Sequence, residues 1–117
     1  ELRKILKKSV HLTKNNKKII VNLAINYGSK TEILSAFKKT KKINLKNLEK
    51  NLYTKNMANP DILIRTGGHQ RLSNFMLWQL AYAELFFLKK LWPDFNSNDL
   101  AKIVSKYKKS KRNFGGL

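Results

Sequence analysis

Residues 60–75 read Pro-Asp-Ile-Leu-Ile-Arg-Thr-Gly-Gly-His-Gln-Arg-Leu-Ser-Asn-Phe, and this stretch decides the fold. Three branched apolar residues come before Arg65, a Thr-Gly-Gly turn follows it, and an apolar pattern with helical spacing begins at Asn74. The order predicts a strand, a glycine turn and a helix. A short, wholly apolar strand is typical of a parallel sheet covered by helices, so the expected fold class is α/β.

The glycine turn favours an anionic ligand. Gly67 and Gly68 allow positive φ angles and a close approach of the backbone, so their N–H groups are expected to form a concave anion site. Ser73 or Asn74 is expected to cap the following helix, whose N-terminus carries partial positive charge. Ligands of parallel sheets lie beyond the carboxyl ends of the strands, which is where Arg65 falls.

Two arginines strengthen this interpretation. A glycine turn with a single arginine is more often a plain surface feature, but Arg65 and Arg71 both flank the turn, with Ser73 close behind. Each guanidinium can hold two phosphate oxygens at once. The predicted ligand is therefore a phosphate or a diphosphate.

Composition limits the other possibilities. The 117 residues allow one small domain, 42% of them are apolar, and there is no cysteine for a disulfide or a thiolate metal site. No apolar run approaches the roughly 20 residues that span a bilayer, and no signal peptide is visible, so we expect a cytoplasmic protein. The formal net charge of +18 is typical of proteins that bind nucleic acids or anionic membranes, but it comes from lysines scattered over the whole chain.

Periodicity predicts the remaining elements. Helices are expected at Glu1–Asn16, Thr31–Lys39, Asn74–Ala83 and Asn98–Lys108, with a short helix inside Lys41–Asn59; strands are expected at Lys18–Tyr27 and Glu84–Leu88, and a turn at Trp92–Phe95. The first helix has a lysine-rich face, so it either packs against the sheet or lies on a membrane surface.

Three stretches resemble one known family. Residues 21–33, residues 60–95 and the tail at 111–116 resemble, in this order along the chain, the C-terminal half of the cis-prenyltransferases, most closely the bacterial undecaprenyl diphosphate synthases. The resemblance implies the C-terminal part of a cis-prenyltransferase-like fold. It also implies an enzyme that adds isopentenyl diphosphate to an allylic diphosphate such as farnesyl diphosphate. Such an enzyme would be a homodimer in the cytoplasm, with peripheral contact to the membrane surface as a further possibility. The product would be a cis-polyprenyl diphosphate such as undecaprenyl diphosphate, a cell wall precursor.

The same resemblance implies site residues. Arg65, Arg71, Leu72 and Ser73 would hold isopentenyl diphosphate, and Glu84 would bind Mg²⁺, which takes carboxylate, phosphate and water oxygens. An ion pair with a lysine, or a place at a subunit edge, is the alternative for Glu84.

Three further residues are expected to support the site. Glu32 stands at an acidic position of the family, although it could equally be a solvated acid in the first turn of a helix. His69 replaces the family's glutamate, and it could donate to a phosphate, join Glu84 at the metal, or only cover the turn. Arg112 belongs to the tail, which lies near the active site or the dimer interface in the family.

The family's N-terminal motif, of His-Gly-Asp-Gly-Asn character, has no counterpart in the sequence. We therefore expect residues 1–117 to form the C-terminal part of a single domain, with no catalytic residue of their own and no activity alone. Two other classes stay open. The chain could be a non-catalytic partner subunit of a heteromeric prenyltransferase. A small basic nucleic-acid-binding protein is the other alternative, although the aromatic residues lie in apolar runs and not among the lysines, so we expect no nucleic-acid partner.

Overall fold

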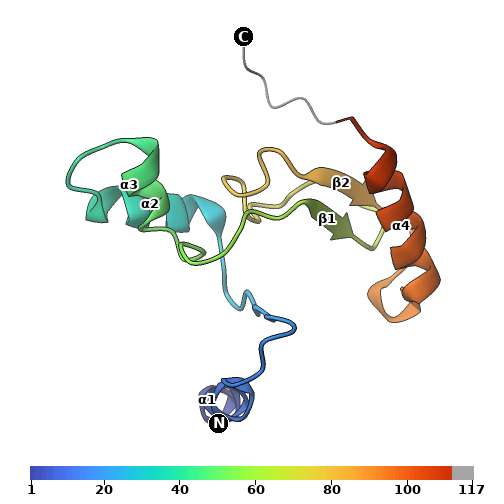
Figure 1. Ribbon diagram of the computed structural model, residues 1–117, viewed down its shortest axis with the longest axis horizontal. Helices are drawn as coiled ribbons and strands as arrows, with labels where there is room; N and C mark the ends of the chain where they lie inside the picture. The colour runs from blue at the N-terminus through green and yellow to red at the C-terminus, as the bar shows by residue number, and fades with distance from the viewer. Residues whose placement is uncertain (112–117) are drawn as a thin grey trace.

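The computed structural model describes residues 1–111, and Figure 1 shows their arrangement. Along the chain the elements are α1 (Leu2–Thr13), α2 (Ser29–Lys39), α3 (Leu45–Glu49), β1 (Ile62–Arg65), β2 (Glu84–Phe87), the 3₁₀ turn η1 (Trp92–Asp94) and α4 (Ser97–Lys109). The expected helices at α1, α2, α3 and α4 are confirmed, as are the strands at β1 and β2.

The sheet is parallel, as predicted. Within the described residues it consists of β1 and β2, with Ile62 opposite Glu84 and Arg65 opposite Phe87. Parallel strands bring their carboxyl ends to the same edge, so Arg65 and Phe87 end the sheet together. Helix α4 lies beside the strands in Figure 1, and the Tyr107 hydroxyl donates to Asp61 Oδ1 at 3.0 Å, just before β1.

The buried apolar side chains belong to two groups. Ala36, Leu52 and Leu80 come from α2, the segment after α3 and the loop between the strands, whereas Ile103 is the buried residue of α4. In Figure 1 the α2 and α3 group stands on the opposite side of the loop from the sheet and α4. The loop between β1 and β2 bonds to the start of α2, so it links the two parts of the fold in addition to the chain between α3 and β1.

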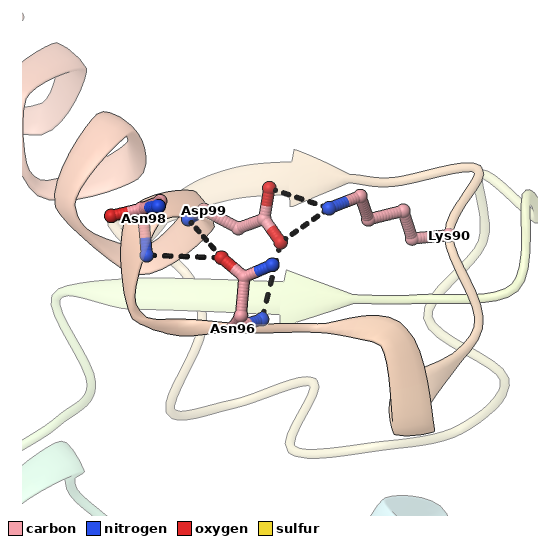
Figure 2. A network of polar contacts seen from close by, with 4 residues as sticks. All are labelled: Lys90, Asn96, Asn98 and Asp99. Carbon is pink, nitrogen blue, oxygen red and sulfur yellow. Dashed lines mark hydrogen bonds and ion pairs between the residues drawn. The ribbon is translucent and has the colours of Figure 1, made fainter.

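Helix α4 has a cap built from its own sequence. Figure 2 shows Asn96 accepting from the backbone N–H groups of Asn98 and Asp99 at 3.0 and 3.2 Å, while the Asp99 carboxylate accepts from the Asn96 N–H at 3.1 Å. This is a capping box, which satisfies donors that the helix leaves free at its start. Lys90 adds an ion pair to Asp99 at 2.7 Å.

The strand expected at Lys18–Tyr27 is wrong for this structure. Residues 19–25 have no regular secondary structure and belong to no sheet of the described chain, and their apolar side chains are exposed, with Ile19 and Ile20 at 77%. A strand needs a neighbour for its N–H and C=O groups, and no strand lies beside this one in the described residues. We call residues 19–25 the exposed apolar segment.

The helix expected at Asn74–Ala83 is also wrong. The segment is a series of turns, and Ser73, Asn74 and Met76 have φ angles of 49, 61 and 46°. Left-handed residues cannot continue a right-handed helix, so the apolar periodicity here does not produce one. Helix α1, in contrast, forms as expected; none of its residues is buried, and Leu2 and Ile5 are more than half exposed. No helix within residues 1–111 combines the length and the apolar character that crossing a bilayer requires.

Candidate diphosphate site

The predicted site residues come together at the carboxyl end of β1. A cavity of about 330 Å³ there is lined by Leu63, Ile64, Arg65, Thr66, Arg71, Leu72, Ser73 and Phe75. All four residues expected to hold the diphosphate, Arg65, Arg71, Leu72 and Ser73, are among them. The strand places Arg65 at the sheet edge, and the loop brings the other three back to it.

The two arginines differ in what they contact. Nη1 of Arg65 donates to the Arg71 carbonyl and, at 2.9 Å, to Ser73 Oγ. Arg65 therefore holds the loop on the sheet. The Arg71 side chain is exposed, and within residues 1–111 its guanidinium has no hydrogen bond to protein. Since a guanidinium offers five N–H donors, Arg71 has its donors available for an anion beside the cavity.

The glycine turn adopts the predicted conformation but not the predicted chemistry. Gly67 and Gly68 have φ angles of 90 and 77°, as expected. Their N–H groups, however, donate to the carbonyls of Lys90 and Leu88, at 2.7 and 2.8 Å. The expected anion site made of these two N–H groups is therefore wrong, because the donors already fix the turn to the segment after β2. The positive charge that would bind an anion at this site must therefore come from side chains.

Glu32 is not the solvated acid of the alternative interpretation. Its side chain is 0% exposed, and its carboxylate accepts from the Tyr27 hydroxyl, from the Tyr53 N–H at 2.8 Å and from Gln79 Nε2 at 3.1 and 3.2 Å. A buried carboxylate is tolerated when hydrogen-bonded in this way. Burial, and then the hydrogen bond to Glu32, raise the pKa of the Tyr27 phenol above its usual 10.0. We call these four residues the Glu32 network.

The Glu32 network reaches the cavity through an aromatic contact. The ring of Tyr27 packs edge-on against Phe75, with 5.7 Å between ring centroids, and Phe75 lines the cavity. Glu32 thus supports the site through its neighbours and does not line it. Sequence analysis missed Tyr27, Tyr53 and Gln79; the one available signal was a glutamine inside an otherwise apolar stretch.

The remaining candidates lie apart from the cavity. His69 is exposed and is absent from the cavity lining within the described residues. Arg112 lies outside the described residues. Glu84 begins β2, opposite Ile62, so it is three strand positions from the edge where Arg65 lies, or about 10 Å along the strand.

Glu84 is not among the described residues that line the cavity. No group of three metal-ligating side chains occurs in residues 1–111 either. The described lining of the cavity contains no carboxylate, and the metal role of Glu84 stays a prediction.

Comparison with known proteins agrees with this fold and site. Residues 1–115 match the sequence family described as "Putative undecaprenyl diphosphate synthase". The isoprenyl transferase of Rickettsia prowazekii is 44% identical over 119 residues, which cover 97% of this chain and 53% of the relative. The isoprenyl transferase of Oceanobacillus iheyensis is 44% identical over 116 residues, covering 90% of this chain and 46% of the relative.

Solved structures give the same result. Lavandulyl diphosphate synthase from Lavandula x intermedia, determined with dimethylallyl diphosphate, superposes with a TM-score of 0.90 at 34% identity, over 98% of this chain and 54% of the plant chain. A "probable undecaprenyl diphosphate synthase" from Campylobacter jejuni gives 0.85 at 33% identity, over 98% and 56%. The chain spans about half the length of the relatives that it matches. Over that span, it belongs to the undecaprenyl diphosphate synthase family of prenyltransferases.

Proposed function

We propose that this chain binds isopentenyl diphosphate for a prenyltransferase that condenses it with an allylic diphosphate such as farnesyl diphosphate. The product would be a cis-polyprenyl diphosphate such as undecaprenyl diphosphate. The observation that carries the proposal is the gathering of Arg65, Arg71 and Ser73 on one cavity at the sheet edge.

The lining of the cavity suits this ligand at both ends. Arg65, Thr66, Arg71 and Ser73 offer charged and hydroxyl donors for a diphosphate, while Leu63, Ile64 and Phe75 offer apolar surface for a short hydrocarbon chain. Arginine is the side chain best suited to grip phosphate oxygens in pairs. A ligand with one anionic end and one apolar end fits this division.

In the reaction, the isopentenyl double bond attacks the allylic carbon while the allylic diphosphate leaves. The adduct then loses a proton from C2, which the released diphosphate can accept, to form the new double bond. The residues of this chain hold isopentenyl diphosphate in place, and such fixed orientation is a large part of the rate gain in two-substrate reactions. No residue of the described cavity is assigned a proton transfer. The site for the allylic diphosphate and the aspartate motif belong to the N-terminal part of the domain, which we place outside these 117 residues.

The exposed apolar segment supports that division of the domain. Ile19, Ile20 and Val21 are 75 to 77% exposed. Such an apolar run is stable in water only when another segment covers it. We propose that the N-terminal part of the domain covers it and that residues 1–117 alone are inactive.

The proposal is tested by titrating isopentenyl diphosphate into the protein in a calorimeter. Arg71→Ala is expected to weaken binding about tenfold or more, since charged hydrogen bonds to a phosphate contribute about 1.5–3 kcal/mol each. Arg3→Ala is the matched control, because it removes the same charge from the exposed helix α1, and it is expected to bind like the wild type. Equal binding by Arg71→Ala and wild type would contradict the proposal.

Several parts of the prediction rest on the family resemblance alone. These are the Mg²⁺ requirement, the role of Glu84 in it, the homodimer, the cytoplasmic location and contact with the membrane surface. Repeating the titration with Mg²⁺ and with EDTA tests the first of them. Arg112 and His69 stay candidates for contacts to the substrate.

A further inference from the structure

We propose that Asn74 is a positioning residue of the isopentenyl diphosphate site, because it caps helix α2 from the loop that carries Arg71 and Ser73. The inference rests on the proposed function for its ligand. It assigns Asn74 no contact with the substrate. The role of Asn74 is to hold the loop where Arg71 and Ser73 face the cavity.

Helix α2 lacks a side-chain cap from its own sequence. Gly28 is its N-cap residue, and a glycine has no side-chain acceptor. The first two N–H groups of the helix find their acceptors on Asn74: Ser29 N donates to the Asn74 carbonyl at 2.8 Å, and Lys30 N donates to Asn74 Oδ1 at 2.9 Å. Asparagine is one of the best capping residues, and here Asn74 caps α2 from a distant part of the chain.

A third hydrogen bond runs from the loop to the helix. Ser29, which is 0% exposed, accepts at its Oγ from the N–H of Leu77 at 2.9 Å. The start of α2 and the loop residues 74–77 therefore exchange donors and acceptors. We call these three hydrogen bonds the α2 lock.

Gly28 shows how closely the two segments approach. A Cβ at this position would lie 2.9 Å from Asn74 Nδ2, which is too close for a real contact. The φ angle of Gly28 is −147°, which any residue can adopt. A side chain at position 28 would therefore meet the Asn74 amide, whereas the backbone angle would accept it.

The conformation of the loop connects the lock to the cavity. Ser73 and Asn74 are consecutive left-handed residues, with φ of 49 and 61°. Ser73 Oγ accepts from Arg65 on the cavity side, and Asn74 binds α2 on the other side. Asparagine adopts left-handed conformations more readily than most residues. Releasing Asn74 from α2 would let the turn move, and with it Ser73 and the neighbouring Arg71.

The test is a titration of isopentenyl diphosphate into four variants, each shown by circular dichroism to be folded. Asn74→Gly keeps the left-handed backbone but removes the side-chain cap, and it is expected to bind about tenfold more weakly, the scale of loss from a slightly misplaced binding group. Asn74→Asp restores the acceptor and is expected to recover most of the affinity. Asn96→Ala is the matched control, since it removes the cap of α4 and Asn96 does not line the cavity, and it is expected to bind like wild type.

The fourth variant, Arg71→Ala, separates the two proposals. If the wild type and Arg71→Ala bind alike, the proposed function fails whatever Asn74 does. If Arg71→Ala loses binding but Asn74→Gly does not, or if Asn74→Asp binds no better than Asn74→Gly, the positioning role of Asn74 is refuted. Hydrogen exchange of the amides at residues 71–73 tests the same role without ligand: faster exchange is expected in Asn74→Gly and unchanged exchange in Asn96→Ala. Equal exchange at residues 71–73 in Asn74→Gly and wild type would refute it as well.

Discussion

Helices α2 and α4 both begin beside an asparagine, but the two asparagines come from different places in the sequence. Asn96 directly precedes α4 and caps it together with Asp99, three residues later (Figure 2). Asn74 caps α2 from a loop that follows the helix by many residues. The cap of α4 can form as soon as that helix forms, whereas the cap of α2 requires the tertiary fold. The difference makes α2 the helix whose stability is tied to the site.

The largest expected effect comes from the Glu32 network, which packs on α2. Glu32→Ala removes the acceptor of the Tyr27 hydroxyl and of the Tyr53 N–H, while Gln79 Nε2 keeps its bond to Thr54 Oγ1. Unsatisfied buried groups cost about 1–3 kcal/mol each. We expect a loss of about 3 kcal/mol or more in the free energy of unfolding, measured with urea. Glu1→Ala, which removes a carboxylate from the exposed start of the chain, is the control and is expected to stay within about 0.5 kcal/mol of wild type. A similar loss in both variants would mean that the network adds nothing to the fold.

Gly28→Ala tests the close approach in the α2 lock. The added methyl group meets Asn74 Nδ2, so we expect about 1–3 kcal/mol of destabilisation, the usual cost of overpacking. The same substitution in an Asn74→Gly background is expected to cost clearly less, because the clashing amide is gone. A double-mutant cycle on unfolding free energies measures this coupling. Additive losses would show that the two residues do not meet.

Asn96→Ala tests the cap of α4 in the same way. It removes the acceptor for the Asn98 and Asp99 N–H groups, and the loss of an asparagine cap costs about 1 kcal/mol. Thermal unfolding is expected to show this loss while isopentenyl diphosphate binding stays unchanged. Weaker binding in Asn96→Ala would indicate that capping in general, and not the α2 lock, controls the site.

The smallest expected effects are opposite responses to pH. Lys90, and then the Asn96 N–H, hold the pKa of Asp99 below its usual 3.8, so the contribution of the α4 cap is present above that pH and is lost as the pH falls through the lowered pKa. Tyr27 has a raised pKa, so its contribution is present below pH 10.0 and is lost as the pH rises through the raised pKa. Urea unfolding across pH checks both, with Asp99→Asn and Tyr27→Phe removing the respective response. If the pH dependence of stability persists after the substitution, it arises from another titratable group.

Sequence analysis succeeded where local patterns decide the structure. The apolar run at 62–64, the helical spacing of α2 and the turn at Trp92–Phe95 are properties of neighbouring residues, and the corresponding elements formed. Arg65, Arg71, Leu72 and Ser73 also came together, since a strand end and a short following loop cannot lie far apart.

The wrong predictions concern segments whose structure depends on residues that are distant in sequence. Residues 19–25 have a strand sequence, but a strand also needs a partner, which no local pattern can show. Residues 74–83 have helical spacing, but Asn74 bonds to α2 in preference to capping a helix of its own. Gly67 and Gly68 took the expected φ angles, yet their N–H groups bind the segment after β2. Each error concerns a hydrogen-bond partner that is remote in sequence.

The contact between Gly28 and Asn74 also has an evolutionary consequence. The backbone of Gly28 would accept any residue, so the amide of Asn74 is what excludes a side chain there. Selection at one position therefore depends on the residue at the other. Among related sequences, position 28 is expected to admit alanine or serine chiefly where position 74 has a smaller residue, and the two positions should covary.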